Sequence, residues 1–230
     1  MSKPLLLLHG ALGSASQFDV LQQMLEEQDR KVYTLNFSGH GGKPLSHKGF
    51  SIQVFADEVF DFLEQNALSQ VDIFGYSMGG YVALWLAAHH PEKINKIFSL
   101  GTKFDWSEAS AIHETKKLNP DKIVEKVLGF AKVLEERHKP LDWKEVMLNT
   151  ADLMRELGRE PLLHQEVLCS INTKTCIAVG DADDMVNRFH SEDVSKLLTN
   201  ASFMILKETP HMIERINLTT LSQTLNEFFA

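Results

Sequence analysis

The chain has 230 residues, of which 43% are hydrophobic, and its formal net charge is −8 at pH 7. This length allows one α/β domain with a modest insertion, or two small domains, and it is enough to bury a sizeable core. The negative charge argues against nucleic acid or an anionic membrane surface as a main partner, and no basic cluster in the sequence contradicts this.

The cysteines and the apolar runs bear on the cellular compartment. Cys169 and Cys176 form neither a disulfide framework nor a zinc-ligand spacing, so we expect reduced thiols and a cytoplasmic location. No stretch approaches the length of a transmembrane helix. The four leucines at residues 5–8 end in His-Gly and lack a small-residue cleavage site, which favours a first buried strand over a signal peptide.

The first 101 residues alternate short β-type runs with helical patterns. We predict strands at residues 5–8, 31–37, 71–74 and 94–100. We predict helices from a cap at Ser14 or Ser16 to about Gln28, from a cap at Ser51 through residue 63, and over residues 80–90. Residues 38–42 are expected to be a loop. This rhythm indicates an α/β fold with a mostly parallel central sheet and helices on both faces.

The rhythm breaks between Thr102 and Glu160, where only helical patterns occur. Two amphipathic stripes lie there, formed by Ile123, Val127, Phe130 and Leu134, and by Trp143, Val146, Met147, Leu153, Met154 and Leu157. Strands are predicted again at residues 175–179 and 202–206, with one helix between them and one after. We therefore expect residues 1–101 and 161–230 to form the core and residues 102–160 to form an inserted helical cap. An insertion after Leu100 follows the carboxyl end of a strand, where ligands bind in such sheets.

The segment Gly75-Tyr76-Ser77-Met78-Gly79 has the pattern of a nucleophile elbow. A predicted strand precedes it and a predicted helix follows it, which is the context that this motif requires. The tight turn exposes the Ser77 hydroxyl at a helix N-terminus, where backbone N–H groups favour developing negative charge. We therefore predict that Ser77 is a nucleophile, with a flexible Gly/Ser loop as the alternative.

A serine needs a base, and the base needs a group that orients it. His211 follows the last predicted strand, and we choose it as the base from this position. Five other histidines sit in polar surroundings without a motif: His47, His113, His138, His164 and His190. Asp181, Asp183 and Asp184 follow the preceding strand as candidates for the orienting acid, and an acidic loop is the alternative reading.

An oxyanion hole would complete this chemistry. One donor is expected to be the backbone N–H of Met78, the residue after the nucleophile. The other should come from the loop after the first strand, where His9-Gly10 allows a tight turn that aims the Ala11 N–H inward. We expect His9 itself to be structural.

With these elements the chain resembles the α/β-hydrolase superfamily over essentially its whole length, including the order Ser, Asp, His. The family's acid motif, G-x-x-D-x-x-V, begins at Gly180 in this chain and so identifies Asp183 as the acid, with Asp184 as the alternative. The resemblance also implies a helical cap over the active site. Three residues depart from frequent family choices, namely Asn36, Asn187 and Pro210, and none of them removes a catalytic group.

The resemblance and the residues together predict a serine hydrolase that acts on a small ester or thioester through an acyl-enzyme. They imply a small-molecule substrate, no cofactor and no metal, and they leave the oligomeric state open. A serine nucleophile argues against the related haloalkane dehalogenases and epoxide hydrolases, which use aspartate. Phe130, Trp143 and Met147 are candidates for an acyl pocket, although we favour a place in the core of the cap.

Two alternatives stay open. A lyase resembling the one of the menaquinone pathway, or a carbon–carbon bond hydrolase, would use the same three side chains. The lyase usually has an arginine where this chain has Tyr81. A non-catalytic ligand-binding protein with the hydrolase fold is the alternative of another class.

Overall fold

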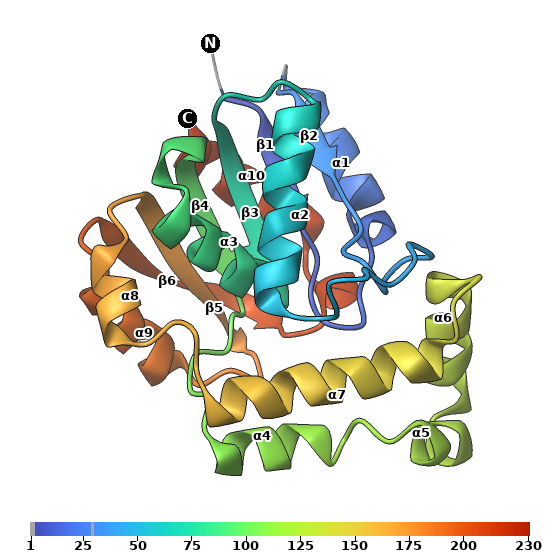
Figure 1. The fold of residues 1–230 in the computed structure, drawn as a ribbon. Helices are drawn as coiled ribbons and strands as arrows, with labels where there is room; N and C mark the ends of the chain where they lie inside the picture. Colours follow the sequence, from blue (N-terminus) through green and yellow to red (C-terminus); the bar gives the residue numbers. More distant parts are fainter. Residues whose placement is uncertain (1–2, 29) are drawn as a thin grey trace.

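The computed structural model describes residues 3–28 and 30–230, so residues 1, 2 and 29 of the expected core lie outside the described residues. Six strands form one sheet in the order β2-β1-β3-β4-β5-β6, and all neighbouring strands are parallel (Figure 1). The strands are β1 (Leu5–Leu8), β2 (Val32–Thr34), β3 (Val71–Tyr76), β4 (Ile94–Leu100), β5 (Lys174–Ala182) and β6 (Ala201–Pro210). The predicted parallel sheet is confirmed.

Helices cover both faces of this sheet, as its buried strands require. One face carries α2 (Ile52–Gln65), α3 (Met78–His89), α8 (Gln165–Ser170) and α9 (Arg188–Leu197), and the other carries α1 (Asp19–Glu26) and α10 (Leu218–Phe229). Successive side chains of β1 alternate between the two cores: Leu6 and Leu8 face the first group, and Leu5 and Leu7 face the second. Because both faces of β1 are buried, all four of its residues are apolar.

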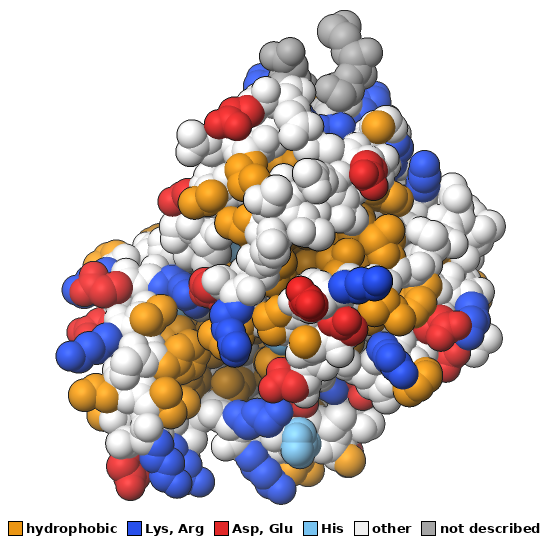
Figure 2. Space-filling view, turned by 180° about the vertical axis from the view of Figure 1, so that it is seen from behind, with side chains coloured by type: hydrophobic (Ala, Val, Ile, Leu, Met, Phe, Trp, Pro, Cys, Tyr) orange, Lys and Arg blue, Asp and Glu red, His pale blue; other side chains and the backbone are white. Residues whose placement is uncertain are grey.

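Four further helices lie between β4 and β5 in the chain: α4 (Glu108–Thr115), α5 (Pro120–Lys126), α6 (Leu128–His138) and α7 (Trp143–Arg159). We call them the inserted helices. They lie together at the end of the sheet where the strands terminate (Figure 1). Phe130, Trp143 and Met147 pack with one another in a separate apolar cluster, together with Leu12 of the loop after β1. Seen from behind, the rear face carries acidic and basic side chains interspersed, with apolar ones gathered beside a hollow near these helices (Figure 2).

Several boundaries differ from those predicted. Strand β2 ends at Thr34 because the chain leaves the sheet near Asn36, whose side chain accepts a hydrogen bond from the Ala15 N–H (2.7 Å) and donates one to the Gly41 carbonyl (3.1 Å). The helix capped by Ser14 is a 3-10 turn, Ala15–Phe18, followed by α1. Helix α8 was not predicted, since its six residues are too few for a periodic signal. In the described part of the chain, no helix is both long and apolar enough to span a membrane.

Candidate active site

Ser77 occupies a strained turn between β3 and α3. Its φ of 52° and ψ of −116° lie in a region that side chains other than glycine rarely adopt, and its N–H donates to the Leu100 carbonyl at 2.8 Å. A Cβ on Gly75 would lie 2.5 Å from the backbone of Gly80, and one on Gly79 would overlap the Leu8 carbonyl. Close backbone packing therefore explains both glycines, and α3 begins directly after the serine, two residues earlier than we predicted.

The structure brings His211 to Asp183 rather than to Asp184. His211 Nδ1 lies 2.8 Å from Asp183 Oδ2, and both side chains are buried. The other oxygen, Asp183 Oδ1, accepts the backbone N–H groups of Met185 and Val186, each at 2.9 Å. Asp184 is exposed. With Nδ1–H donated to the carboxylate, Nε2 is left as an acceptor, which is the tautomer that a general base needs.

Residues of the central strands fix this pair in place. The Tyr76 hydroxyl, beside the nucleophile, donates to the His211 carbonyl at 2.8 Å, and burial raises the pKa of Tyr76. Gly101, at the end of β4, has a φ of 64°, and an added Cβ would lie 3.3 Å from both Asp183 Oδ2 and His211 Nδ1. The backbone of one strand end thus packs directly against the pair.

The loop after β1 forms a tight turn over residues 10–13. The Gly13 N–H donates to the Gly10 carbonyl at 3.1 Å, and His9 Nδ1 donates to the same carbonyl at 2.8 Å. His9 Nε2 accepts the Phe37 N–H at 3.2 Å, so the ring joins the loops after β1 and β2. Ala11, one of the two expected oxyanion donors, lines the same cavity as Ser77, and so does Met78, the other.

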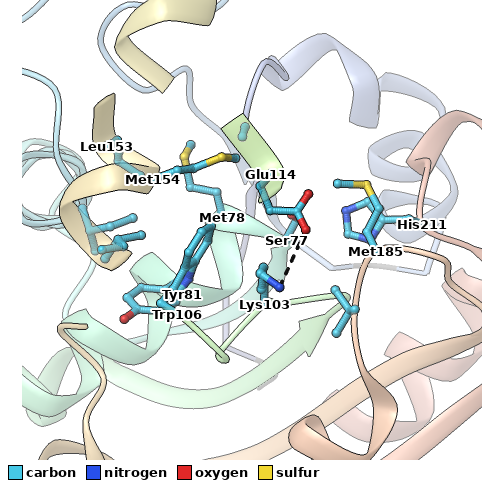
Figure 3. Close-up of a pocket in the computed structure, with 14 residues that line it drawn as sticks. Ser77, Met78, Tyr81, Lys103, Trp106, Glu114, Leu153, Met154, Met185 and His211 are labelled. Atoms are coloured by element: carbon cyan, nitrogen blue, oxygen red, sulfur yellow. Dashed lines mark ion pairs between the residues drawn. The ribbon is translucent and has the colours of Figure 1, made fainter. Parts of the chain in front are cut away.

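One cavity collects these groups. It opens to solvent, and its free volume is about 60 Å³. His211 and Met185 lie on one side of Ser77, and a largely apolar arm extends on the other (Figure 3). The full lining comprises Ala11, Ile52, Ser77, Met78, Tyr81, Lys103, Trp106, Glu114, Leu153, Met154, Leu157, Met185, Val186 and His211. Phe130, Trp143 and Met147 lie instead in the cluster described above.

Two lining residues are charged. Lys103 Nζ lies 2.8 Å from Asp105 Oδ1 and 3.8 Å from Glu114 Oε1, and Lys117 holds the other oxygen of Glu114 at 3.0 Å. The Lys103–Glu114 pair lies near Ser77, between the two sides of the cavity (Figure 3). Sequence reasoning missed these residues, because isolated charges in a helical segment resemble those of any solvated helix face.

Sequence reasoning also misplaced His138. We expected it in polar surroundings, but it is fully buried, as are His9 and His40; these three form a histidine cluster. The His40 ring centre lies 5.0 Å from that of His9 and 5.9 Å from that of His138. Burial lowers the pKa values of His9 and His138 to about 4 and holds that of His40 well below its usual range. All three rings are therefore neutral near pH 7. The charged neighbours of His138 in the sequence gave no sign of this burial.

Comparisons with known proteins bear on the family and the fold of the chain. The family model for the alpha/beta hydrolase fold matches residues 3–129. A 91-residue segment is 34% identical to a probable alcohol acetyltransferase of Cyberlindnera fabianii, covering 39% of this chain and 24% of that protein. A 95-residue segment is 36% identical to the pimeloyl-[acyl-carrier protein] methyl ester esterase of Neisseria meningitidis, covering 41% of this chain and 35% of that one. The matched segments thus span about a quarter to a third of these relatives.

The likeness in three dimensions extends further along the chain. The crystal structure of NosK from Streptomyces actuosus superposes with a TM-score of 0.83, covering 100% of this chain and 98% of that one at 17% identity. At that identity the likeness concerns the fold alone. The family match covers more than half of the chain, and the sheet order, the elbow turn and the whole-length superposition fit it. The chain therefore belongs to the α/β-hydrolase fold family.

Proposed function

We propose that this protein is a serine hydrolase that cleaves a small ester or thioester through an acyl-enzyme intermediate. The observation that carries the proposal is the 2.8 Å contact between His211 Nδ1 and Asp183 Oδ2 at a cavity that Ser77 also lines. In the proposed roles, Ser77 is the nucleophile, His211 the base and Asp183 the group that orients it. The presence of all three side chains favours an enzyme over a ligand-binding protein, because binding a ligand requires none of them.

The proposed reaction has two stages. Ser77 Oγ attacks the acyl carbon while His211 Nε2 takes its proton, and the imidazolium then gives that proton to the departing alcohol or thiol. A water molecule attacks the acyl-enzyme with the same base and releases the acid. The backbone N–H groups of Ala11 and Met78 are the proposed donors to the oxyanion in both stages. Each such donor is typically worth about 3 kcal/mol of barrier.

The lining of the cavity favours a substrate with a small, mainly apolar acyl group. Its apolar arm takes Leu153, Met154 and Leu157 from α7, and α4 contributes Glu114. We propose on this basis that residues 102–160 act as a cap that sets substrate choice. Since the free space is narrow, movement of this cap would admit larger substrates.

Acyl transfer to an alcohol is a second candidate, favoured by the narrow apolar cavity, which limits water at the acyl-enzyme. The relative from Cyberlindnera fabianii carries the name of a probable alcohol acetyltransferase. Both reactions share the first stage and differ only in the acceptor. Adding ethanol to the assay distinguishes them, because transfer yields an ethyl ester in place of the free acid.

The experiment that tests the proposal is turnover of p-nitrophenyl acetate by the wild type, Ser77→Ala and Ser170→Ala. Ser170 is an exposed serine in α8 outside the cavity, which makes it a matched control. We expect turnover by the wild type and the control and loss of at least about 10³-fold in Ser77→Ala, as for removal of a triad member. No turnover by the wild type on esters of any acyl length would favour the ligand-binding alternative. Full activity in Ser77→Ala would show that the nucleophile is wrong.

A further inference from the structure

The end of helix α6 contacts the loop after β1 at a single carbonyl. His138 Nε2 lies 3.2 Å from the Leu12 carbonyl oxygen, and Arg137 Nη1 donates to the same oxygen at 3.0 Å. His138 Nδ1 accepts the Gly41 N–H at 3.1 Å. A neutral imidazole has one donor and one acceptor, and a carbonyl oxygen has two lone pairs, so each of these atoms is fully used. These partners require the tautomer of His138 that carries its proton on Nε2.

Leu12 needs such support because its backbone is strained. It stands third in the turn of residues 10–13 with a φ of 56°, a place where turns favour glycine or asparagine. The left-handed conformation is unfavourable for a residue with a side chain, because its Cβ comes too close to the following carbonyl oxygen. The peptide between Leu12 and Gly13 is held on both sides, by the bond from the Gly13 N–H to the Gly10 carbonyl and by the bonds from α6 to the Leu12 carbonyl.

The side chain of Leu12 is held by the same helices. It is 9% exposed and packs in the apolar cluster with Ala131 and Leu134 of α6 and with Trp143 of α7. The inserted helices therefore hold Leu12 both through its carbonyl and through its side chain. The residue before it, Ala11, lines the cavity with Ser77.

Arg137 also reaches the segment that follows the proposed base. Its Nη2 lies 2.6 Å from Glu214 Oε1, and Gln17 donates to the same oxygen at 2.7 Å. Glu214 is three residues after His211. One guanidinium thus connects the loop after β1 with the loop after β6, and planar, bidentate groups of this kind fix geometry as well as contributing energy.

We propose that His138 and Arg137 are positioning residues of the oxyanion hole, which hold the turn of residues 10–13 in the conformation that places the Ala11 N–H at Ser77. This inference rests on the proposed function. It also makes the oxyanion hole depend on docking of α6, because any movement of the inserted helices away from this loop would remove the support of Leu12.

The test compares variants that remove the contacts with a buried control. His138→Phe removes both polar contacts with a ring of similar size, and Arg137→Met removes the guanidinium. Thr150→Val is the control, since Thr150 is equally buried in α7 but bonds only to the Val146 carbonyl of its own helix. The measurements are kcat and KM on p-nitrophenyl acetate, the inhibition constant of a boronic acid that forms a tetrahedral adduct on Ser77, and the melting temperature.

We expect each single variant to lower kcat by about 10-fold and the double variant by about 100-fold, which reaches only the lower end of the 10²–10³-fold loss typical for removing a donor outright. KM should stay within about twofold, and boronic acid binding should weaken by the same factor as kcat, because both depend on the oxyanion donors. His138→Gln keeps a donor and should recover most of the loss. If His138→Phe does not fold, Arg137→Met alone carries the test.

Either of two outcomes would overturn the inference while the proposed function stands, and a third would overturn both. If the folded double variant keeps the wild-type kcat, or if Thr150→Val loses as much kcat at a similar drop in melting temperature, the two residues have only a structural role. Wild-type protein that neither turns over esters nor binds the boronic acid at Ser77 would refute the proposed function, and this inference with it.

Discussion

Replacement of Asp183 by asparagine tests the proposed orientation of the base most sharply. Asp183 Oδ1 accepts two backbone N–H groups, so in Asp183→Asn the amide oxygen must occupy that position. The amide NH₂ then faces His211 Nδ1 in place of Oδ2. An NH₂ group donates and cannot accept, so the imidazole is forced into the tautomer with its proton on Nε2. That tautomer cannot take the proton of Ser77.

The expected loss follows from this exchange of tautomers. Since the corresponding change in a serine protease lowers kcat by about 10⁴-fold, we expect a similar factor here, which corresponds to roughly 5.5 kcal/mol. Stability should change little, because the two backbone N–H groups keep their acceptor. The assay is kcat on p-nitrophenyl acetate together with the melting temperature, and the matched control is Asp184→Asn, which alters an exposed carboxylate in the same loop. A folded Asp183→Asn protein within tenfold of the wild type, or an equal loss in the control, would refute the reasoning.

Three further predictions follow from burial and packing. Burial lowers the pKa of His138 from 6.5 to about 4, so below pH 6.5 the unfolded chain binds a proton that the folded chain does not. His138 should therefore remove roughly 3 kcal/mol of stability as the pH falls from 6.5 to 4, and His9 and His40, whose pKa values burial also lowers, should add to this fall. In urea titrations the fall should be smaller by roughly 3 kcal/mol in His138→Gln than in the wild type, and an equally steep fall in that variant would contradict the role of His138. Gly79→Ala should destabilise the fold by roughly 3 kcal/mol, because the added Cβ overlaps the Leu8 carbonyl. Gly129→Ala should stabilise the fold by up to about 1 kcal/mol, because nothing lies within 4 Å of its added Cβ. Similar melting temperatures for the two variants would refute the packing argument. Leu153→Ala should raise the ratio of kcat/KM for hexanoyl esters to kcat/KM for acetyl esters by about 10-fold. Trp143→Ala should leave that ratio unchanged and lower the stability by about 3–5 kcal/mol. The opposite pattern would exclude our assignment of the residues that line the cavity.

The parts of the fold that could be predicted from the sequence are those with local signals. The run before Ser77, the glycines around it and the apolar helix after it form a pattern that few structures other than a strand, a sharp turn and a helix satisfy. The register after Gly180 likewise indicated Asp183, because a fixed loop length carries the acid to the same place at the end of β5. Such features depend on residues near one another in the chain, so the sequence displays them directly.

The parts that could not be predicted depend on distant segments. His138 lies between Arg137 and Lys139, a polar setting, and its burial arises only because α6 docks against the loops after β1 and β2. Lys103 and Glu114 meet at the cavity because α4 packs against α7 and so brings Glu114 to 3.8 Å from Lys103 in the segment after β4. The stripe with Leu153 and Leu157 was visible as amphipathic, but whether an apolar face packs in a core or lines a cavity is decided by its partner, which the sequence does not specify.

The central claim is that an acyl group is transferred to Ser77. The most direct measurement is rapid quenching of the enzyme during turnover of p-nitrophenyl acetate, followed by intact-mass analysis and peptide mapping. We predict a mass increase of one acetyl group on the peptide that contains Ser77, absent from the Ser77→Ala protein. An acetyl group on another residue during turnover, or wild-type turnover by Ser77→Ala, would contradict the account.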